Sequence, residues 1–123
     1  MAEHNEFGKK SEELAEDFLR KKGYEILDRN FVFQKAEIDI IAKAGNCIVI
    51  IEVKARATDV FLEPQEAVTK KKIRLLVNAA DEYLNQNNLI EEVRFDIISV
   101  VQAKDKAPVI THIENAFEAF DAN

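Results

Sequence analysis

Three charged residues lie inside two runs of aliphatic side chains in the middle of the chain. Asp39 interrupts residues 38–41, and Glu52 and Lys54 lie near the end of the run that begins at Cys47. Runs of β-branched residues are typical of strands inside a sheet, where an isolated charge is costly unless it is paired or holds a metal. Because successive side chains of a strand point to opposite faces, Glu52 and Lys54 are expected to point the same way.

A carboxylate on one strand and a Glu-x-Lys on the next are suited to metal-dependent hydrolysis of a phosphodiester. Mg²⁺ activates a water and stabilises the leaving oxyanion, and it prefers a few carboxylates plus waters. Asp39 and Glu52 can supply the carboxylates, with a main-chain carbonyl near Val53 as a further ligand. Lys54 can orient or deprotonate the water, or offset charge on the phosphate. The alternative is a cross-strand salt bridge on a solvated face, since Glu-x-Lys occurs on many exposed strands.

These residues need a sheet with helices packed on it to bring them together. Apolar periodicity predicts a helix over residues 9–22, ended by Gly23. The order of helix, three strands, helix, strand and strand predicts a mixed sheet in one α/β domain spanning residues 1–123. Strands are expected at residues 24–27 (continuing towards 33), 37–42, 47–55, 93–101 and 109–113. A turn is expected at residues 43–46, a long helix at 65–86 and a short helical piece at 115–120.

Glu12 is a candidate third carboxylate from the first helix. It lies three residues before Ala15, so it sits at the margin of the buried face of that helix. From this position it can join Asp39 and Glu52 in holding a metal.

The chain is acidic overall, with a local basic segment. The net charge of -6 argues against broad electrostatic attraction to nucleic acid, which counts against a nuclease. Residues 54–74, however, hold six basic residues against three acidic ones. Arg56, Lys72 and Arg74 are therefore candidates for contacts with nucleic-acid phosphates. The alternative is that the lysines of this segment form a solvated helix surface.

The cysteine content and the N-terminus favour a cytoplasmic location. The single Cys47 cannot form a disulfide within the chain, which fits a reducing compartment. Residues 1–6 are polar and lack the apolar stretch of a signal peptide, and no segment approaches a membrane-spanning length.

The remaining polar residues of the last strands favour structural roles. His4 and His112 are too few and too far apart for a zinc site, so His112 is expected to be a strand residue with a satisfied side chain. Arg94 and Asp96 fall on one strand face, where they can pair with nearby groups.

Motifs spread along nearly the whole chain match the pattern of a known family. Residues 8–15 resemble its opening G-x-x-G-E-x-x-A, residues 36–42 stand for G-E-I-D-L-I-A, and residues 51–56 stand for F-V-E-V-K-x-R. Residues 94–96 and 112–117 match its ending. The sequence thus resembles the YraN-like family of uncharacterised bacterial proteins, within the restriction-endonuclease-like (PD-(D/E)XK) superfamily and distantly similar to archaeal Holliday junction resolvases.

The resemblance implies a restriction-endonuclease-like fold with an α-β-β-β-α-β core. It assigns catalysis to Glu12, Asp39, Glu52 and Lys54, and metal binding to the three carboxylates among them. It also implies Mg²⁺ (or Mn²⁺) as the cofactor and DNA, in a branched or recombining form, as the substrate. The related resolvases work as dimers, which allows a homodimer here, although no sequence pattern fixes an interface.

Three glycines of the family are replaced in this chain. Ser11 and Ala36 are small substitutions that the helix start and the strand entry should tolerate. Leu62 follows Phe61 in a polar loop, where a glycine permits a bend or a close approach to a ligand. We therefore expect Leu62 to alter the contacts of that loop with a substrate.

Three hypotheses follow from the sequence. The leading one is a Mg²⁺-dependent nuclease that acts on DNA. The second is a non-catalytic module of the same fold that binds nucleic acid or a protein partner, which the negative net charge and Leu62 keep open. The third is a purely structural charge cluster, in which Glu52 stabilises the fold and no metal binds.

Overall fold

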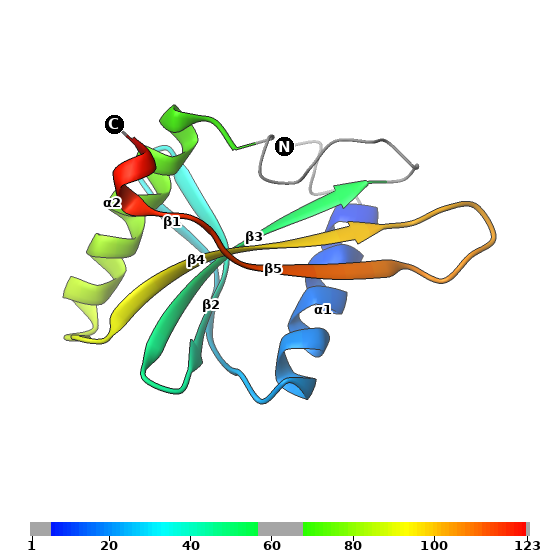
Figure 1. Ribbon diagram of the computed structural model, residues 1–123, viewed down its shortest axis with the longest axis horizontal. Coiled ribbons are helices and arrows are strands. Elements are labelled where there is room, and N and C mark those ends of the chain that lie inside the picture. The colour runs from blue at the N-terminus through cyan, green and yellow to red at the C-terminus, as the bar shows by residue number, and fades with distance from the viewer. Residues whose placement is uncertain (1–5, 57–67, 123) are drawn as a thin grey trace.

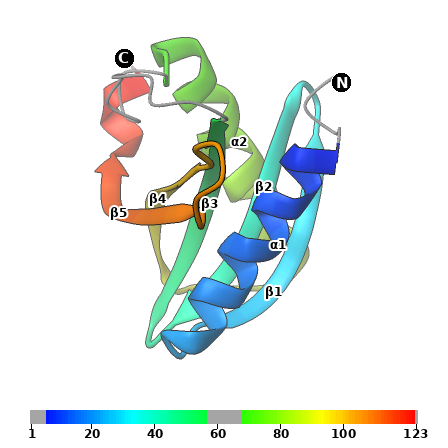
Figure 2. The same cartoon turned by 90° about the vertical axis from the view of Figure 1, so that its right-hand side faces the viewer.

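A five-stranded sheet with a helix on each face forms the centre of the molecule. The computed structural model describes residues 6–56 and 68–122. Figures 1 and 2 show α1 on one face of the sheet and α2 on the other. The elements in chain order are α1 (Glu6–Lys21), β1 (Glu25–Phe33), β2 (Ala36–Ala44), β3 (Cys47–Arg56), α2 (Lys70–Gln86), β4 (Glu92–Val101), β5 (Val109–Phe117) and the short 3-10 helix η3 (Ala119–Ala122).

The strand order in space equals the order along the chain, β1-β2-β3-β4-β5. Only β3 and β4 pair in parallel within this sheet, and the other neighbours are antiparallel. A parallel pair needs a crossover connection, and α2 lies in that connection. The mixed α/β sheet predicted from the sequence is confirmed, and the observed order contains the α-β-β-β-α-β core that the family resemblance implies.

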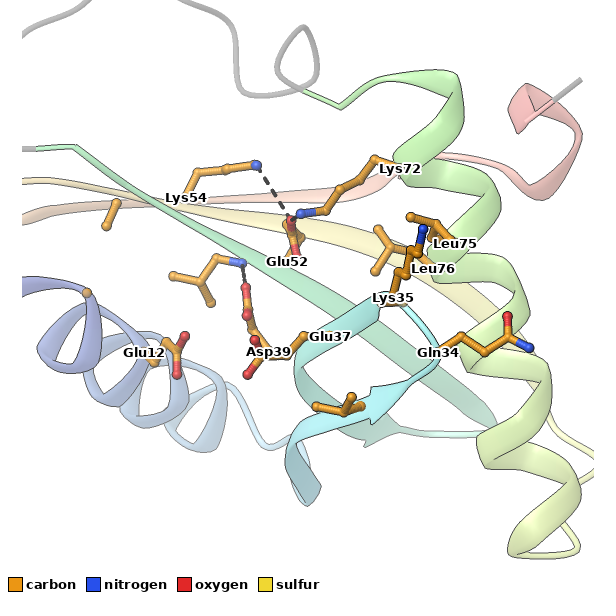
Figure 3. Close-up of a pocket in the computed structure, with 15 residues that line it drawn as sticks. Glu12, Gln34, Lys35, Glu37, Asp39, Glu52, Lys54, Lys72, Leu75 and Leu76 are labelled. Carbon is orange, nitrogen blue, oxygen red and sulfur yellow. Dashed lines mark hydrogen bonds and ion pairs between the residues drawn. The ribbon is translucent and has the colours of Figure 1, made fainter. Parts of the chain in front are cut away.

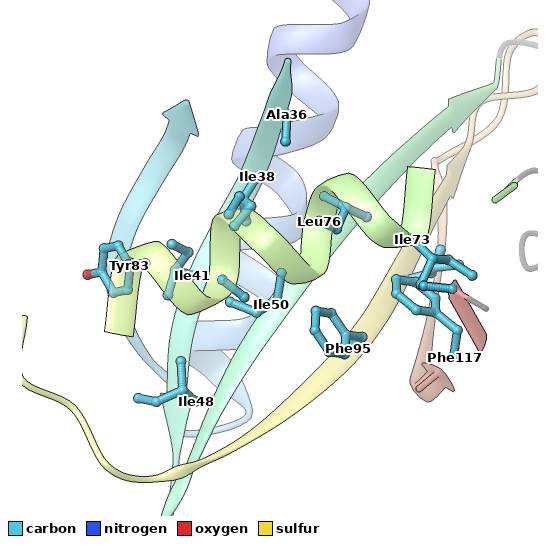
Figure 4. Packing of buried hydrophobic residues seen from close by; sticks show 14 residues of the cluster. Ala36, Ile38, Ile41, Ile48, Ile50, Ile73, Leu76, Tyr83, Phe95 and Phe117 are labelled. Carbon is cyan, nitrogen blue, oxygen red and sulfur yellow. The ribbon is translucent and has the colours of Figure 1, made fainter. Parts of the chain in front are cut away.

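Two hydrophobic clusters hold the helices on the sheet. Ile48 and Ile50 of β3 pack in the cluster beneath α2 (Figure 4). Val49 and Ile51 pack in the cluster beneath α1. All four are at most 2% exposed, so β3 is apolar on both faces, as expected for a central strand. Glu52 is the next even-numbered residue, and the same alternation directs its side chain to the α2 side.

The predicted start of the long helix was wrong. The sequence pattern placed it at residue 65, but Val68 and Thr69 are not helical and α2 begins at Lys70. Thr69 decides this boundary because its hydroxyl accepts a hydrogen bond from the backbone N–H of Lys72 at 3.1 Å, the contact of an N-cap residue. Apolar periodicity cannot show such a cap.

Two further boundaries differ from the sequence-based prediction. A turn was expected over residues 43–46, but β2 continues through Ala44 and the turn is reduced to the two residues before Cys47. Gly45 adopts a positive φ of 60°, which lets the chain reverse in this short space. The piece expected to be helical over residues 115–120 is the end of β5, which pairs to Phe117, followed by the 3-10 helix η3.

The two small replacements of family glycines leave the elements intact. Helix α1 passes through Ser11 without interruption, and Ala36 starts β2 while only 5% exposed. Ser11 is fully buried, and its hydroxyl finds no hydrogen-bond partner among the described residues. Such a hydroxyl costs about 1–3 kcal/mol of stability. Phe61 and Leu62 lie outside the described residues.

Candidate functional site

The charged residues of β2 and β3 gather where these two strands separate. The antiparallel ladder between the strands runs from Ala44↔Cys47 to Ile40↔Ile51. Immediately beyond it, the Oδ2 atom of Asp39 accepts a hydrogen bond of 2.8 Å from the backbone N–H of Val53 (Figure 3). The side chain of Asp39 thus replaces a ladder contact, and this fixes its carboxylate beside β3.

A cavity of about 580 Å³ opens at this point, between the N-terminal halves of α1 and α2. Its wall contains all four residues that the sequence predicted as catalytic: Glu12, Asp39, Glu52 and Lys54. Figure 3 shows them with Lys72, which reaches the same space from α2. The structure therefore brings α1, β2, β3 and α2 together around one group of charges.

Glu52 is buried and paired with two lysines. Its side chain is 6% exposed, and its Oε2 atom lies 3.5 Å from Nζ of Lys54 and 2.7 Å from Nζ of Lys72. The contact with Lys54 confirms the prediction that Glu52 and Lys54 share a strand face. A salt bridge on a solvated face, the alternative left open by the sequence, does not describe this carboxylate. Burial lowers the pKa of the Lys72 ammonium, but the Glu52 carboxylate outweighs it and the net pKa is raised.

Burial and neighbouring carboxylates raise the pKa of Asp39 to about 8. Removal from water is the largest cause, the charge of Glu52 adds to it, and the N–H of Val53 opposes both. Glu12 contributes a further, smaller increase. Two acidic groups held in contact in this way gain stability from a proton or a cation placed between them.

The donor atoms of Asp39 and Glu52 fit Mg²⁺. This ion is usually bound through one or two carboxylates and keeps several waters, so two converging carboxylates beside an open cavity suffice. Within residues 6–56 and 68–122, no three His, Cys, Asp or Glu side chains are placed to hold a metal ion together. Glu12 instead accepts a hydrogen bond of 3.2 Å from the Asn30 amide through Oε1. Its role as a third ligand stays a prediction.

The three residues predicted to contact nucleic acid occupy different places. Lys72 lies in the cavity wall, whereas Arg56 and Arg74 are not among the described residues that line it. Arg56 ends β3, and its carbonyl accepts a hydrogen bond from the N–H of Gln102. The Arg74 guanidinium donates to the carbonyl of Ala122 at 3.1 Å, which ties α2 to η3. The structure therefore brings only Lys72 of the three to the catalytic residues.

The sequence analysis missed Gln34 and Lys35, which also line the cavity. They form the two-residue connection between Phe33 at the end of β1 and Ala36 at the start of β2, and Gln34 has a positive φ of 56°. A two-residue hairpin turn is visible in the sequence only when both strand ends are known. The sequence analysis did not fix where the first strand ends, so this turn was not predicted.

The chain matches a known protein family over most of its length. The model of the Uncharacterised protein family UPF0102 matches residues 11–100. The chain belongs to this family. A UPF0102 protein of Christiangramia forsetii is 53% identical, over 98% of this chain and 100% of its own length. Another, from Flavobacterium psychrophilum, is 52% identical, over 98% of this chain and 100% of its own length. The family resemblance drawn from the motifs is confirmed.

Among solved structures, the UPF0102 chain is similar to Hjc of Archaeoglobus fulgidus, a Holliday junction resolvase. The two share 17% sequence identity with a TM-score of 0.39, over 85% of this chain and 75% of that chain. In the described part of the UPF0102 chain, no helix has the length and apolar character needed to cross a membrane.

Asp39 is expected to make this UPF0102 protein less stable as the pH rises from about 4 to about 8. The usual pKa of the side chain is 3.8 and the folded value is about 8, so folding takes up a proton in this window. The free energy of unfolding then falls by up to ~1.4 kcal/mol per pH unit. Asp39→Asn keeps an oxygen for the Val53 N–H but cannot ionise. In urea unfolding with EDTA at pH 8.5, the free energy of unfolding of Asp39→Asn should exceed that of the parent by at least ~2 kcal/mol.

The difference between Asp39→Asn and the parent should vanish below about pH 3, where Asp39 is protonated in both the folded and the unfolded state. Asp81→Asn, an exposed position on α2, serves as the control and should follow the parent at every pH. Equal pH dependence of the parent and of Asp39→Asn would contradict the assignment.

Proposed function

We propose that this chain is a metal-dependent endonuclease that hydrolyses phosphodiester bonds of DNA, with branched or recombining DNA as its substrate class. One observation carries the proposal. The carboxylates of Asp39 and Glu52, from neighbouring strands, meet in a cavity that also holds Lys54 and Lys72. A structural charge cluster needs no such opening to solvent, whereas a reaction on a bound phosphate does.

Each residue of the site has a distinct task in this reaction. Asp39 and Glu52 would hold the Mg²⁺ (or Mn²⁺), with Asp39 kept in position by the N–H of Val53. Bound there, the cation supplies an activated water and stabilises the leaving oxygen. The ammonium of Lys54 lies beside the Glu52 carboxylate, where it can orient the attacking water or offset charge on the phosphate. Glu12 faces the cavity from α1 and adds negative charge that favours a cation.

The lysines of the cavity bear on the objection raised by the net charge of -6. Three lysines line the cavity: Lys35, Lys54 and Lys72. They come from the β1–β2 turn, from β3 and from α2, so positive charge surrounds the carboxylates on several sides. The same cavity is lined by four carboxylates, those of Glu12, Glu37, Asp39 and Glu52. The lysines can therefore attract a phosphate once a bound divalent cation offsets these carboxylates.

A non-catalytic nucleic-acid-binding module is the second candidate, and one observation favours it. Glu52 is already neutralised by two ammonium groups, so its charge is compensated without a metal. A module of this kind would bind DNA through lysines and would have no need of a divalent cation.

A cleavage panel separates the two candidates. The purified protein is expected to cut at least one of duplex, single-stranded, flap and four-way DNA in Mg²⁺ or Mn²⁺, and none in EDTA. Asp39→Ala, purified in parallel, controls for contaminating nucleases and should be inactive. An inactive parent whose DNA binding is sensitive to salt, but indifferent to Mg²⁺ and to Asp39→Ala, would replace the endonuclease with the binding module.

A further inference from the structure

Lys72 holds the Glu52 carboxylate more closely than Lys54 does. Both ammonium groups approach the same Oε2 atom, Lys72 at 2.7 Å and Lys54 at 3.5 Å. The Lys72 side chain is 43% exposed, whereas that of Glu52 is 6% exposed. Figure 3 shows Lys72 extending from α2 across the cavity to Glu52. The lysine is therefore the partly exposed member of the pair and the glutamate is the buried one.

The position of Lys72 is unfavourable for the helix that carries it. Lys70, Lys71 and Lys72 form the start of α2, and its first turn has no acidic residue. The N-terminal end of a helix carries a partial positive charge, so cations there cost stability. A residue that breaks a local rule in this way commonly serves a function. For Lys72 the structure shows what it gains, which is the contact with Glu52 inside the cavity.

The cation that the proposed function requires must reach the same carboxylate. The Lys72 ammonium fills the space next to Oε2 of Glu52, and two cations cannot share that space without strong repulsion. Lys72 can leave the Glu52 carboxylate because its long side chain is flexible and partly in water. Lys54 lies farther from the same carboxylate, at 3.5 Å, so a metal ion can bind without breaking a close contact of Lys54. Once free, the ammonium is at the cavity where the DNA phosphate would lie.

Building on the proposed function, we propose that Lys72 is a built-in cation that competes with the divalent metal for Glu52 and is exchanged for it. The exchange sets the metal affinity of the site below that of its carboxylates alone. It also couples metal binding to the release of a positive charge towards the phosphate of the substrate. Lys72 is in this sense a positioning residue, since it acts on the metal through Glu52.

Calorimetric titration of the full chain with Mn²⁺, without DNA, tests the exchange. Lys72→Met removes the competing charge, so its Mn²⁺ affinity should rise roughly tenfold over the parent. Lys72→Gln is a second variant with the same expectation. Lys72→Arg keeps the charge and should stay close to the parent. Lys71→Met removes an equal charge from the exposed neighbour on the same helix and should change the affinity by less than about twofold.

The outcomes distinguish this inference from the proposed function. If the parent binds Mn²⁺ and cleaves DNA, but Lys72→Met and Lys72→Gln bind Mn²⁺ no more tightly, the exchange is wrong and the endonuclease stands. If the Mn²⁺ affinity of Lys71→Met rises as much as that of Lys72→Met, the effect is general electrostatics and the exchange is again wrong. If the parent and all variants take up no Mn²⁺, both proposals fail.

Discussion

Replacing Asp96 by alanine is expected to lower the free energy of unfolding by about 3–5 kcal/mol. Asp96 lies in β4 and is fully buried. Its Oδ1 atom accepts hydrogen bonds from Nε of Arg94 and from the backbone N–H of Asn115, both at 2.9 Å. Its Oδ2 atom lies 2.8 Å from Nη2 of Arg94 and 2.7 Å from Nε2 of His112. One carboxylate thus satisfies groups of both β4 and β5.

The network around Asp96 also reaches the residues that follow α1, and it indicates the tautomer of His112. Nζ of Lys22 lies 2.8 Å from Nδ1 of His112. An ammonium can only donate, so Nδ1 accepts and the ring proton lies on Nε2, facing Asp96. Arg94 also donates to the Tyr24 hydroxyl at 2.7 Å. Removing the Asp96 carboxylate would take from Arg94 its closest carboxylate. It would also leave the buried Nε2–H of His112 and the backbone N–H of Asn115 without their acceptor, which is the physical reason for the large loss.

The Asp96 contribution has a defined pH dependence. Burial raises the pKa of Asp96, but the hydrogen bonds from His112 and Arg94 outweigh it and the net pKa is lowered. A lowered folded pKa means that the stabilisation is present above the usual aspartate range and is lost as the pH falls below it. The loss in Asp96→Ala should therefore be full at pH 7 and smaller in strong acid.

Urea unfolding at pH 7 measures the effect of Asp96→Ala. Asp81→Ala is the matched control, because Asp81 is exposed on α2, and it should stay within about 0.5 kcal/mol of the parent. Asp96→Asn keeps part of the hydrogen-bond acceptor capacity, so its loss in free energy of unfolding should fall between those of Asp81→Ala and Asp96→Ala. A loss below ~1 kcal/mol in Asp96→Ala would show that the network does not hold the sheet to the end of α1.

The core of the site was predictable from the sequence because it depends on strand geometry. The alternation of side chains placed Glu52 and Lys54 on one face, and the short turn after β2 placed Asp39 beside them. The same reasoning applies to Asp96, an isolated charge among buried apolar residues, and the sequence analysis correctly placed it on one strand face with Arg94. His112 was expected to be a strand residue with a satisfied side chain, and this is confirmed.

The contacts that cross between distant segments were not predictable. Lys72 follows Glu52 by twenty residues, and no local pattern tells where a helix docks on a sheet. Lys72 was therefore a candidate for phosphate contact or a solvated surface residue, whereas it pairs with Glu52. The meeting of Lys22, Tyr24, Arg94 and His112 around Asp96 likewise depends on the packing of α1 against β4 and β5. Helix periodicity also overlooked the Thr69 cap, after which α2 begins at Lys70.

Replacing Glu52 by glutamine is expected to reduce metal-dependent DNA cleavage by about 10³-fold or more. Glutamine keeps the length and most of the shape of the side chain, but it carries no negative charge. It therefore offers the metal a weaker ligand and no longer attracts Lys54 and Lys72, which now sit at 3.5 and 2.7 Å from the carboxylate. The reaction loses a metal ligand and the placement of Lys54 in one step, which is why we expect a large effect.

Fold stability must be separated from chemistry in this experiment. Glu92→Gln is the matched control, since it removes one negative charge from an exposed position at the start of β4 and should keep parental activity. Cleavage of the most reactive DNA in the panel gives the rate, and thermal unfolding in EDTA shows that both variants are folded. Because the lysines of the cavity are partly exposed, they can turn to water and Glu52→Gln should remain folded. A folded Glu52→Gln protein that keeps more than a tenth of the parental rate would exclude this carboxylate from the reaction, and would leave the buried ion pairs of Glu52 as a structural feature of the sheet.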